Sequence, residues 1–410
     1  MSEYSRKLIA EAEAELAPVF KRMEETELIC TKRVLEAFRH NRIAARHFNF
    51  TTGYGYDDEG RDALDRIFAE VFTTEAAIVA PQFSSGTQTI FTALSAILRP
   101  GDTMLSAVGS PYDTLLEAIG IEGSAAGSLK EFGINYRQIE LDENGEIDLE
   151  ALARELEAKP RIVYFQRSRG YEWRNSLLPS QMKPAFDLVK KLSAESVIMV
   201  DNCYGEFTCA EEPTAFGADI IMGSLIKNPG GGIAHTGGYI AGRRDLIDMA
   251  ANRLTVPGIG REAGCWPEGY LPYYQGIFLA PHTVCQALKN AALFACVFER
   301  LGLMSMPSSS AERSDIVQAL RFERKEQLLS FCRVIQSASP VDSFVVPEPW
   351  AMPGYTDEVI MAAGAFVQGS SIELSADGPI REPYTAYIQG GLTYSHGRLA
   401  AEAVLDELIK

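Results

Sequence analysis

The sequence predicts an α/β protein: helices cover a mostly parallel sheet, a smaller α+β domain lies toward the C-terminus, and a helical segment leads the chain. Short runs that are apolar on both faces alternate with longer amphipathic stretches. That alternation is typical of parallel strands buried between layers of helices. We expect the helical segment at 1–50, the large domain at 51–285 and the small domain at 286–410.

The first 45 residues predict a helix. Leu8, Ala12, Leu16 and Phe20 recur on one helical face, with many charged residues between them. A loop rich in glycine and tyrosine follows, "TTGYGYDDEGR", and helical periodicity then resumes in "RDALDRIFAEVF".

The large domain contains the apolar runs that predict a parallel sheet. Amphipathic stretches between them predict helices, and the helix "TIFTALSAIL" ends at "RPGD", where Pro and Gly provide a stop signal. In sheets of this kind, ligands bind beyond the carboxyl ends of the strands. The expected strands are 76–83, 103–108, 161–166, 196–201 and 218–225.

The last third of the chain predicts a long helix and a smaller mixed sheet. The helix covers 281–302, and a second helix, 395–410, closes the chain. Between them, apolar segments predict the strands 342–349, 358–368 and 370–377.

The composition excludes several classes of partner. The chain of 410 residues has 38 basic and 55 acidic residues, which gives a net charge of −17. Nucleic-acid backbones and anionic membranes both require clustered basic residues, so neither is expected as a partner. No run of 18 apolar residues predicts a membrane span, and the charged N-terminus does not resemble a signal peptide.

Cysteine and histidine usage points to a cytoplasmic protein without a metal site. The seven cysteines include no C-x-x-C pair, which favours free thiols in a reducing compartment. Only five histidines occur, and neither H-E-x-x-H nor a Cys/His cluster is present.

The segment "SSGTQ" lies between an expected strand and an expected helix. Ser85, Gly86 and Thr87 would place backbone N–H groups and hydroxyls at the helix N-terminus, which favours an anion such as phosphate. Taken alone, the motif is better explained as a simple helix cap by Ser84 or Ser85.

Two charged residues follow neighbouring expected strands. Asp201 ends "SVIMVD", and Lys227 follows "ADIIMGSL" in a glycine-rich segment. If the two strands are adjacent, both side chains emerge at one edge of the sheet, where burial would lower the pKa of the lysine and make it a nucleophile. The alternatives are a turn aspartate and a surface lysine, respectively.

Together, these groups supply what pyridoxal phosphate requires. The helix N-terminus would bind the phosphate, Asp201 would pair with the protonated pyridine nitrogen, and Lys227 would form a Schiff base with the aldehyde. Ser224 could donate a further hydrogen bond to the phosphate. Tyr112 could lie on the ring face, the alternative being a tyrosine at the edge of the core.

The order "SSGT", "SPYDT", "VDNCYGEF" and "GSLIKNPGGG" followed by "TGGYIAG" resembles the pyridoxal-phosphate enzymes of the aspartate-aminotransferase fold, fold type I. Within them it resembles the cystathionine and methionine gamma-lyase group. "TGYGYDDEGRD", "QRSRGYEWR" and "SADGPIREPY" are similar to its bacterial aluminium resistance, or methionine gamma-lyase-related, branch. The likeness covers nearly the whole chain and is most specific around Lys227.

That resemblance implies a homotetramer of two tight dimers with active sites shared between subunits. It assigns Lys227 to the internal aldimine, Asp201 to the pyridine nitrogen and Tyr112 to stacking on the ring. It also assigns the phosphate to Gly86, Thr87 and Ser224.

The chain departs from the better-studied gamma-lyases at two positions. Their Tyr-x-Arg pair, which reaches the neighbouring subunit's phosphate, is here Tyr54-Gly-Tyr56 without an arginine. Either tyrosine could make that contact, and Arg61 is a candidate to replace the charge. Ile226 stands where those enzymes have a hydroxyl residue, so one phosphate hydrogen bond is expected to be missing.

The resemblance and the motifs predict a lyase that cleaves a carbon–sulfur bond of a sulfur amino acid by β- or γ-elimination, with the freed Lys227 amine as general base. Arg381 is the expected partner of the substrate carboxylate, the alternative being a surface salt bridge. Arg167 and Arg169 are further candidates for contacting cofactor or substrate, unless "RSRGYEWR" is a subunit-contact loop.

Two other functions are compatible with the sequence. One is a pyridoxal-phosphate aldolase or another amino-acid lyase on the same fold. The other is a protein that binds the cofactor, has a metal-tolerance role and turns over little substrate. Nothing in the sequence resembles an aluminium site.

Overall fold

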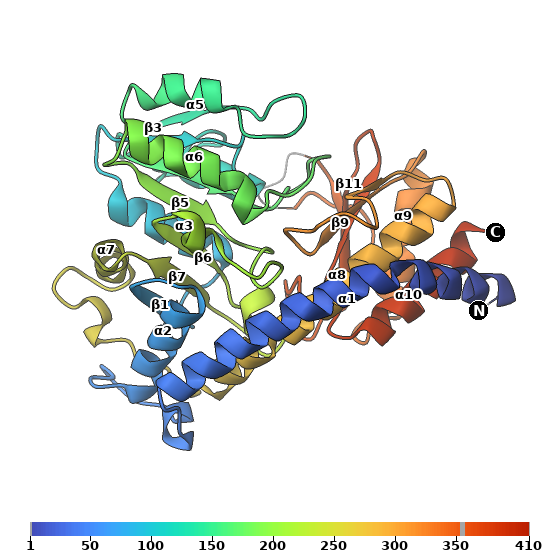
Figure 1. Cartoon of the computed structure of the whole chain (residues 1–410), viewed down its shortest axis with the longest axis horizontal. Helices are drawn as coiled ribbons and strands as arrows, with labels where there is room; N and C mark the ends of the chain where they lie inside the picture. Colours follow the sequence, from blue (N-terminus) through green and yellow to red (C-terminus); the bar gives the residue numbers. More distant parts are fainter. Residues whose placement is uncertain (1, 353–356, 410) are drawn as a thin grey trace.

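The computed structural model describes residues 2–352 and 357–409, which form a large domain, a small domain and a long N-terminal helix (Figure 1). The α-helices are α1 Glu3–His40, α2 Glu59–Val71, α3 Gly86–Ile97, α4 Asp113–Ile119, α5 Leu149–Leu156, α6 Pro179–Leu192, α7 Arg244–Leu254, α8 Leu271–Arg300, α9 Lys325–Ser337 and α10 Tyr394–Leu408. The short 3-10 helices are Ala45–Phe48, Pro213–Phe216, Asn228–Gly230 and Gly260–Glu262.

The large domain is built on a seven-stranded sheet with the order β1-β7-β6-β5-β4-β2-β3. The strands from β6 to β3 in that order are parallel, and β7 runs antiparallel to both β6 and β1. The predicted, mostly parallel sheet is therefore confirmed. Its strands are β1 Ala76–Ala80, β2 Thr103–Ser106, β3 Asn135–Gln138, β4 Ile162–Gln166, β5 Val197–Asp201, β6 Ile220–Ser224 and β7 Gly238–Gly242.

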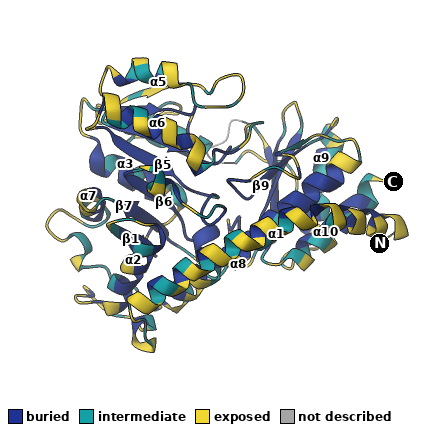
Figure 2. Ribbon diagram, viewed as in Figure 1, coloured by how far each residue is buried: buried dark blue, intermediate teal, exposed yellow. Residues whose placement is uncertain are grey.

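Helices cover both faces of this sheet, because its strands are apolar on both faces. Met199 and Met222 point toward α3, α4 and α7, whereas Val200 and Ile221 point toward the layer that contains α2, α6 and α8. Figure 2 shows the strands as the buried centre, with exposed residues on the outer sides of the helices.

The small domain contains a five-stranded antiparallel sheet with the order β10-β11-β12-β9-β8. The helix α9 packs against β10, β11 and β12. The other side of the sheet carries Val317, Ala319 and Tyr387, which contact residues of the large domain. The strands are β8 Ser305–Met306, β9 Val317–Arg321, β10 Val359–Ala362, β11 Ser375–Pro379 and β12 Thr385–Gln389.

Some predicted elements of the small domain are wrong. Residues 342–349 form no strand, because Pro347 and Pro349 lack the N–H groups that a ladder needs. The strand predicted at 370–377 begins only at Ser375, and β9 and β12 were not predicted.

Two long helices connect the domains. α1 packs along α8, and both run from the large domain into the small one (Figure 1). α8 crosses the predicted boundary at residue 285 without a break. The start of α1 and the end of α10 meet at the small domain, where the Ser2 backbone N–H donates to Asp406 Oδ1 at 3.0 Å.

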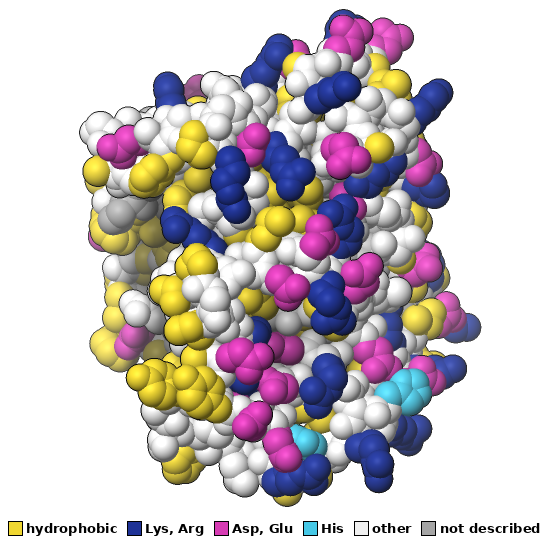
Figure 3. Space-filling model, turned by 90° about the vertical axis from the view of Figure 1, so that its left-hand side faces the viewer, with side chains coloured by type: hydrophobic (Ala, Val, Ile, Leu, Met, Phe, Trp, Pro, Cys, Tyr) yellow, Lys and Arg dark blue, Asp and Glu magenta, His cyan; other side chains and the backbone are white. Residues whose placement is uncertain are grey.

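Acidic and basic side chains are interspersed over the face drawn in Figure 3 rather than separated into patches of one sign. None of the helices within 2–352 and 357–409 is long and apolar enough to cross a membrane.

Candidate active site

A cavity of about 240 Å³ lies beyond the carboxyl ends of β4, β5 and β6, beside the N-terminus of α3. Strands β5 and β6 are hydrogen-bonded neighbours, as the sequence argument required. The cavity is lined by Ser84, Ser85, Gly86, Thr87, Ile90, Tyr112, Thr114, Leu115, Gln166, Ser168, Gly170, Asp201, Cys203, Tyr204, Ser224, Ile226 and Lys227.

One end of the cavity offers hydrogen-bond donors. The Ser85 hydroxyl caps α3 by accepting from the Gln88 N–H at 3.0 Å. Across the part of the chain that the structure describes, the Gly86 and Thr87 N–H groups and the Ser224 hydroxyl have no hydrogen-bond partner. A Cβ at position 86 would lie 3.2 Å from Ser224 Cβ, so glycine keeps this space open.

The carboxylate of Asp201 lies at the end of β5. Its Oδ1 accepts from the Cys203 N–H at 3.0 Å, and the Tyr164 hydroxyl donates weakly to Oδ2 at 3.4 Å. Burial raises the pKa of Asp201, and the positive charge of Lys227 opposes that rise. Oδ2 therefore keeps accepting capacity for a cationic N–H donor in the cavity.

Lys227 enters the cavity from the turn that follows β6. Its backbone N–H donates to Ser224 O at 3.3 Å, and its Nζ lies 4.0 Å from the centroid of the Tyr204 ring. Burial lowers the pKa of Lys227, but the acidic groups around the amine, among them the Asp201 carboxylate, outweigh burial and raise that pKa above its ordinary value. The expected lowering is wrong, because the neighbours of the amine are acidic rather than cationic.

Tyr112 stands at the start of α4, on the wall of the cavity. Its backbone N–H donates to Gln166 Oε1 at 2.7 Å, and Gln166 in turn donates to Ser168 O at 3.1 Å. Gly170 lies beside the tyrosine ring, since a Cβ there would be 3.4 Å from Tyr112 Cδ2. The predicted stacking of Tyr112 on a cofactor ring stays a prediction.

The two arginines of "FQRSRGY" do not line the cavity. Arg167 is fully buried and donates to Ser314 Oγ at 2.8 Å and to Glu212 Oε2 at 3.1 Å. Arg169 is also buried, and its Nη1 donates to Met306 O at 2.7 Å. Both anchor the large domain to the segment that precedes β9.

Gln166 and Ser168 line the cavity, whereas Arg167 and Arg169 turn away from it. Neither Gln166 nor Ser168 was among the site residues predicted from the sequence. Gln166 is the last residue of β4 and pairs in register with Asp201, so its place at the carboxyl end of a strand could have identified it.

Arg381 lies in the loop after β11 and does not line the cavity. Its Nη1 donates to Asp357 Oδ2 at 2.9 Å, and its side chain is 53% exposed. It lies close enough to Asp113, which follows Tyr112, to lower the pKa of that carboxyl against the raising effect of burial. Its predicted contact with a substrate carboxylate stays a prediction.

Tyr54 and Tyr56 do not line the cavity either. They are 69% and 62% exposed, and their rings stack on each other with centroids 5.3 Å apart. Arg61 is buried beneath this loop, where it donates to Gly55 O at 2.9 Å and pairs with Asp62 at 2.8 Å. Arg61 thus supports the loop, and the contact of either tyrosine with a neighbouring subunit stays a prediction.

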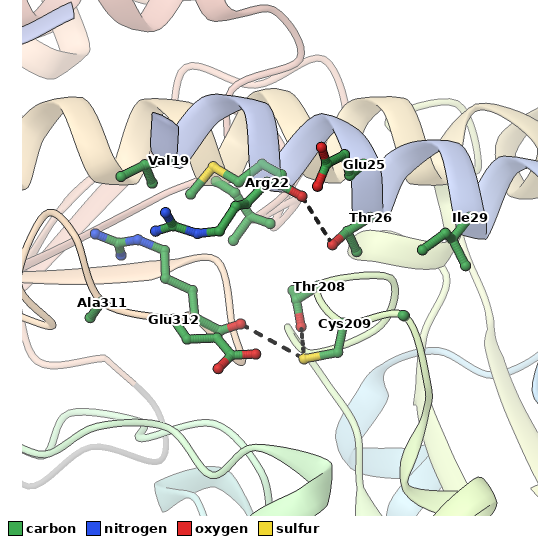
Figure 4. A pocket seen from close by; sticks show the side chains of 13 residues that line it. Val19, Arg22, Glu25, Thr26, Ile29, Thr208, Cys209, Ala311 and Glu312 are labelled. Atoms are coloured by element: carbon green, nitrogen blue, oxygen red, sulfur yellow. Dashed lines mark hydrogen bonds between the residues drawn. The ribbon is translucent and has the colours of Figure 1, made fainter. Parts of the chain in front are cut away.

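A larger hollow, of about 430 Å³, lies between α1 and two loops (Figure 4). Arg22, Glu25 and Glu312 give it charges of both signs. Local bonds engage other polar groups of its wall: Thr26 Oγ1 donates to Arg22 O at 3.2 Å, and the Cys209 thiol contacts Thr208 Oγ1 at 3.7 Å. The mixture of charges favours no class of ligand.

The smaller cavity fits pyridoxal phosphate. The unpaired donors at the α3 N-terminus and Ser224 match a phosphate, and the open oxygen of Asp201 matches a pyridine N–H. Lys227 supplies the primary amine between them. Ile226, which also lines the cavity, provides no hydroxyl.

The chain is similar to several known proteins over nearly its whole length. The chain is 48% identical to the uncharacterized protein YnbB of Bacillus subtilis over 409 residues, 100% of this chain and 97% of that protein. It is similar to the crystal structure of a carbon–sulfur lyase involved in aluminum resistance from Clostridium novyi, with 49% identity, a TM-score of 0.96 and coverage of 100% and 96%.

The pyridoxal-5'-phosphate-dependent protein YhfS of Escherichia coli shares the fold at 16% identity, with a TM-score of 0.62 and coverage of 95% and 96%. The family model described as methionine gamma-lyase matches residues 5–409, which is nearly the whole chain. This chain therefore belongs to the methionine gamma-lyase family.

Proposed function

We propose that the protein is a pyridoxal-phosphate-dependent carbon–sulfur lyase that acts on a sulfur amino acid by β- or γ-elimination. One observation carries the proposal: a single cavity gathers Lys227, Asp201, Ser224 and the N-terminus of α3. The name of the Clostridium novyi relative, a carbon–sulfur lyase, supports the choice of bond.

The chain's own residues would bind and orient the cofactor. The Gly86 and Thr87 N–H groups and the Ser224 hydroxyl would hold its phosphate, and Asp201 would keep a proton on its ring nitrogen. When bound, pyridoxal phosphate supplies the electron sink that stabilises negative charge at the α-carbon of an amino acid.

Lys227 would carry the proton in this reaction. Its amine must lose a proton before it can act as a base, yet the acidic groups around it favour the ammonium form. A cationic N–H paired with Asp201 would neutralise that carboxylate and so remove part of the field that raises the pKa of Lys227. Pairing at Asp201 therefore prepares Lys227 for proton transfer.

We propose that Arg381, which lies near Asp113 and so near the cavity residue Tyr112, binds the substrate carboxylate. Its present partner is Asp357, in an ion pair that is about half exposed. Exposed pairs of this kind contribute about 0–1 kcal/mol, so a substrate carboxylate could displace Asp357 at little cost.

The assignment of Lys227 can be tested by trapping. Borohydride treatment of the protein with added cofactor, followed by peptide mapping, should place the label on Lys227. Lys227→Ala should abolish the label and leave the melting temperature within a few degrees. Lys183→Ala, which removes an exposed lysine from α6, is the control and should keep the label. A label on another lysine would disprove the assignment.

The reaction itself is tested by incubation of the loaded protein with cystathionine, methionine and threonine. Release of keto acid and thiol from the sulfur substrates alone is the expected outcome. Cleavage of threonine alone would replace the proposal with an aldolase or another lyase, and no turnover of any substrate would contradict it.

A further inference from the structure

Tyr204 combines an unusual backbone conformation with a position at the centre of the site. Its φ is +69°, in the left-handed region that residues other than glycine rarely adopt. The Ile316 N–H donates to Tyr204 O at 3.2 Å and helps to hold that conformation. Backbone strain of this kind persists only where the surrounding structure maintains it.

The Tyr204 ring lies between Lys227 and the small domain. One side lies 4.0 Å, measured to the ring centroid, from Lys227 Nζ. The ring also packs with Val317, Ala319 and Tyr387 of the small-domain sheet. Tyr204 therefore connects the amine of the large domain to the small domain.

Lys227 Nζ has no hydrogen bond or ion pair to any residue within 2–352 or 357–409. The Tyr204 ring face is therefore a close contact of this amine that involves no hydrogen bond. An aromatic face attracts a cation within about 6 Å of its centroid, and more strongly where water is partly excluded.

We infer that Tyr204 is a positioning residue for Lys227, and that its ring holds the free amine in the ammonium form between the two domains. The inference rests on the proposed function, since it concerns the same lysine. It adds where Lys227 lies once it has taken up a proton. The charged amine then lies against the Tyr204 ring, which the small domain keeps in position.

Other groups also act on this amine. Asp201, Cys203 and Glu206 reach it from the β5 end and the loop that follows. From the small domain, Asp377 acts on the Tyr204 hydroxyl. Because all of these groups are unchanged in a variant at position 204, a shift in such a variant reports on the tyrosine alone.

The test measures the protonation of Lys227 in the full-length protein after hydroxylamine treatment and dialysis remove any bound carbonyl compound. Acetic anhydride labels only the neutral amine, and peptide mapping as a function of pH gives the labelling midpoint of Lys227. Tyr204→Phe should keep the wild-type midpoint, because the ring remains. Tyr204→Leu, also unbranched at Cβ, should lower the midpoint by about one pH unit, roughly a tenfold rise in labelling below it.

A second series keeps the fold even if Tyr204→Leu does not. Replacement of Tyr204 by phenylalanine, monofluorophenylalanine and trifluorophenylalanine preserves shape and weakens the ring quadrupole stepwise, so the midpoint should fall stepwise. An unchanged midpoint across this series would overturn the inference. So would a shift in Tyr204→Phe as large as that in Tyr204→Leu, because the hydroxyl would then be responsible. Neither result depends on turnover, so a failed lyase assay leaves this test intact.

Discussion

At the scale of single residues, the buried carboxyl of Glu206 makes the stability of the protein depend on pH. Its Oε1 accepts from the Tyr239 hydroxyl at 3.0 Å, and burial raises its pKa from 4.5 to about 8. Gly223 on β6 leaves the space for this carboxyl, since a Cβ there would collide with Glu206 Oε1. The folded protein therefore keeps a proton on Glu206 at a pH where the unfolded chain has lost it.

This proton predicts how stability changes with pH. Between about pH 4.5 and 8 the folded state binds more protons than the unfolded state, so Glu206 lowers the free energy of unfolding as pH rises through that window. Glu206→Gln should remove the contribution of Glu206 to the pH dependence, whereas other buried carboxyls, such as Asp377, keep theirs. As pH rises from 5 to 8, the melting temperature of the variant should increase relative to that of the wild type. Parallel melting curves for the two proteins would contradict this expectation.

Individual site residues could be predicted from the sequence where they follow the ends of neighbouring strands. Asp201, Ser224 and Lys227 could be brought together because β5 and β6 end at one edge of the sheet. Tyr204 could not be predicted in its role, because it depends on a left-handed backbone angle and on packing against a distant sheet. The raised pKa of Lys227 likewise depends on which groups surround it in space.

At the scale of elements, a substitution at the start of α3 should affect helix stability and ligand binding in different directions. Alanine is a better helix former than glycine by about 1 kcal/mol in a helix interior, and a Cβ at position 86 would meet Ser224 Cβ at a tight 3.2 Å. Gly86→Ala should therefore keep or slightly raise the melting temperature while weakening cofactor retention at least severalfold.

Equilibrium dialysis against pyridoxal phosphate, paired with thermal melts, would measure both effects. Ser95→Ala, farther along α3 and not among the residues that line the cavity, is the control and should bind as the wild type does. Equal cofactor affinity in Gly86→Ala and the wild type would show that the phosphate does not lie in this gap.

Helices and strands were predicted correctly where the hydrophobic pattern and the stop signals agreed, as for α3 and for β4 to β6. The prediction missed β7, because the glycine-rich run "TGGYIAG" reads as a loop, although its backbone pairs on both sides with β1 and β6. It placed a strand at 342–349 from apolar residues alone, without counting the missing N–H groups of the two prolines.

At the scale of the molecule, α1 packs along α8 and extends over both domains. Leu16 of α1 is 1% exposed, whereas Leu28 on the same helix is 71% exposed. Leu16→Ala should destabilise the protein by about 2–5 kcal/mol, and Leu28→Ala should change stability by less than about 0.5 kcal/mol. Thermal and urea unfolding would compare them, and equal effects would show that α1 does not contribute to the core.

The overall class, α/β with a smaller second domain, followed from the alternation of apolar and amphipathic segments. The connection between domains did not. A helix predicted from its own amphipathic stripe gives no sign of its partner, so α1 could be predicted as a helix but not as the neighbour of α8 over its length.

The start of α1 and the end of α10 lie together at the small domain, and their proximity permits a circular permutant. Ser2 and Asp406 lie within hydrogen-bonding distance, so a short peptide linker could join the ends into a closed loop. The chain could then be reopened at the exposed turn 142–145, none of whose residues lines the cavity. Such a circular permutant would begin and end within the large domain and still assemble the same cavity from the same strands.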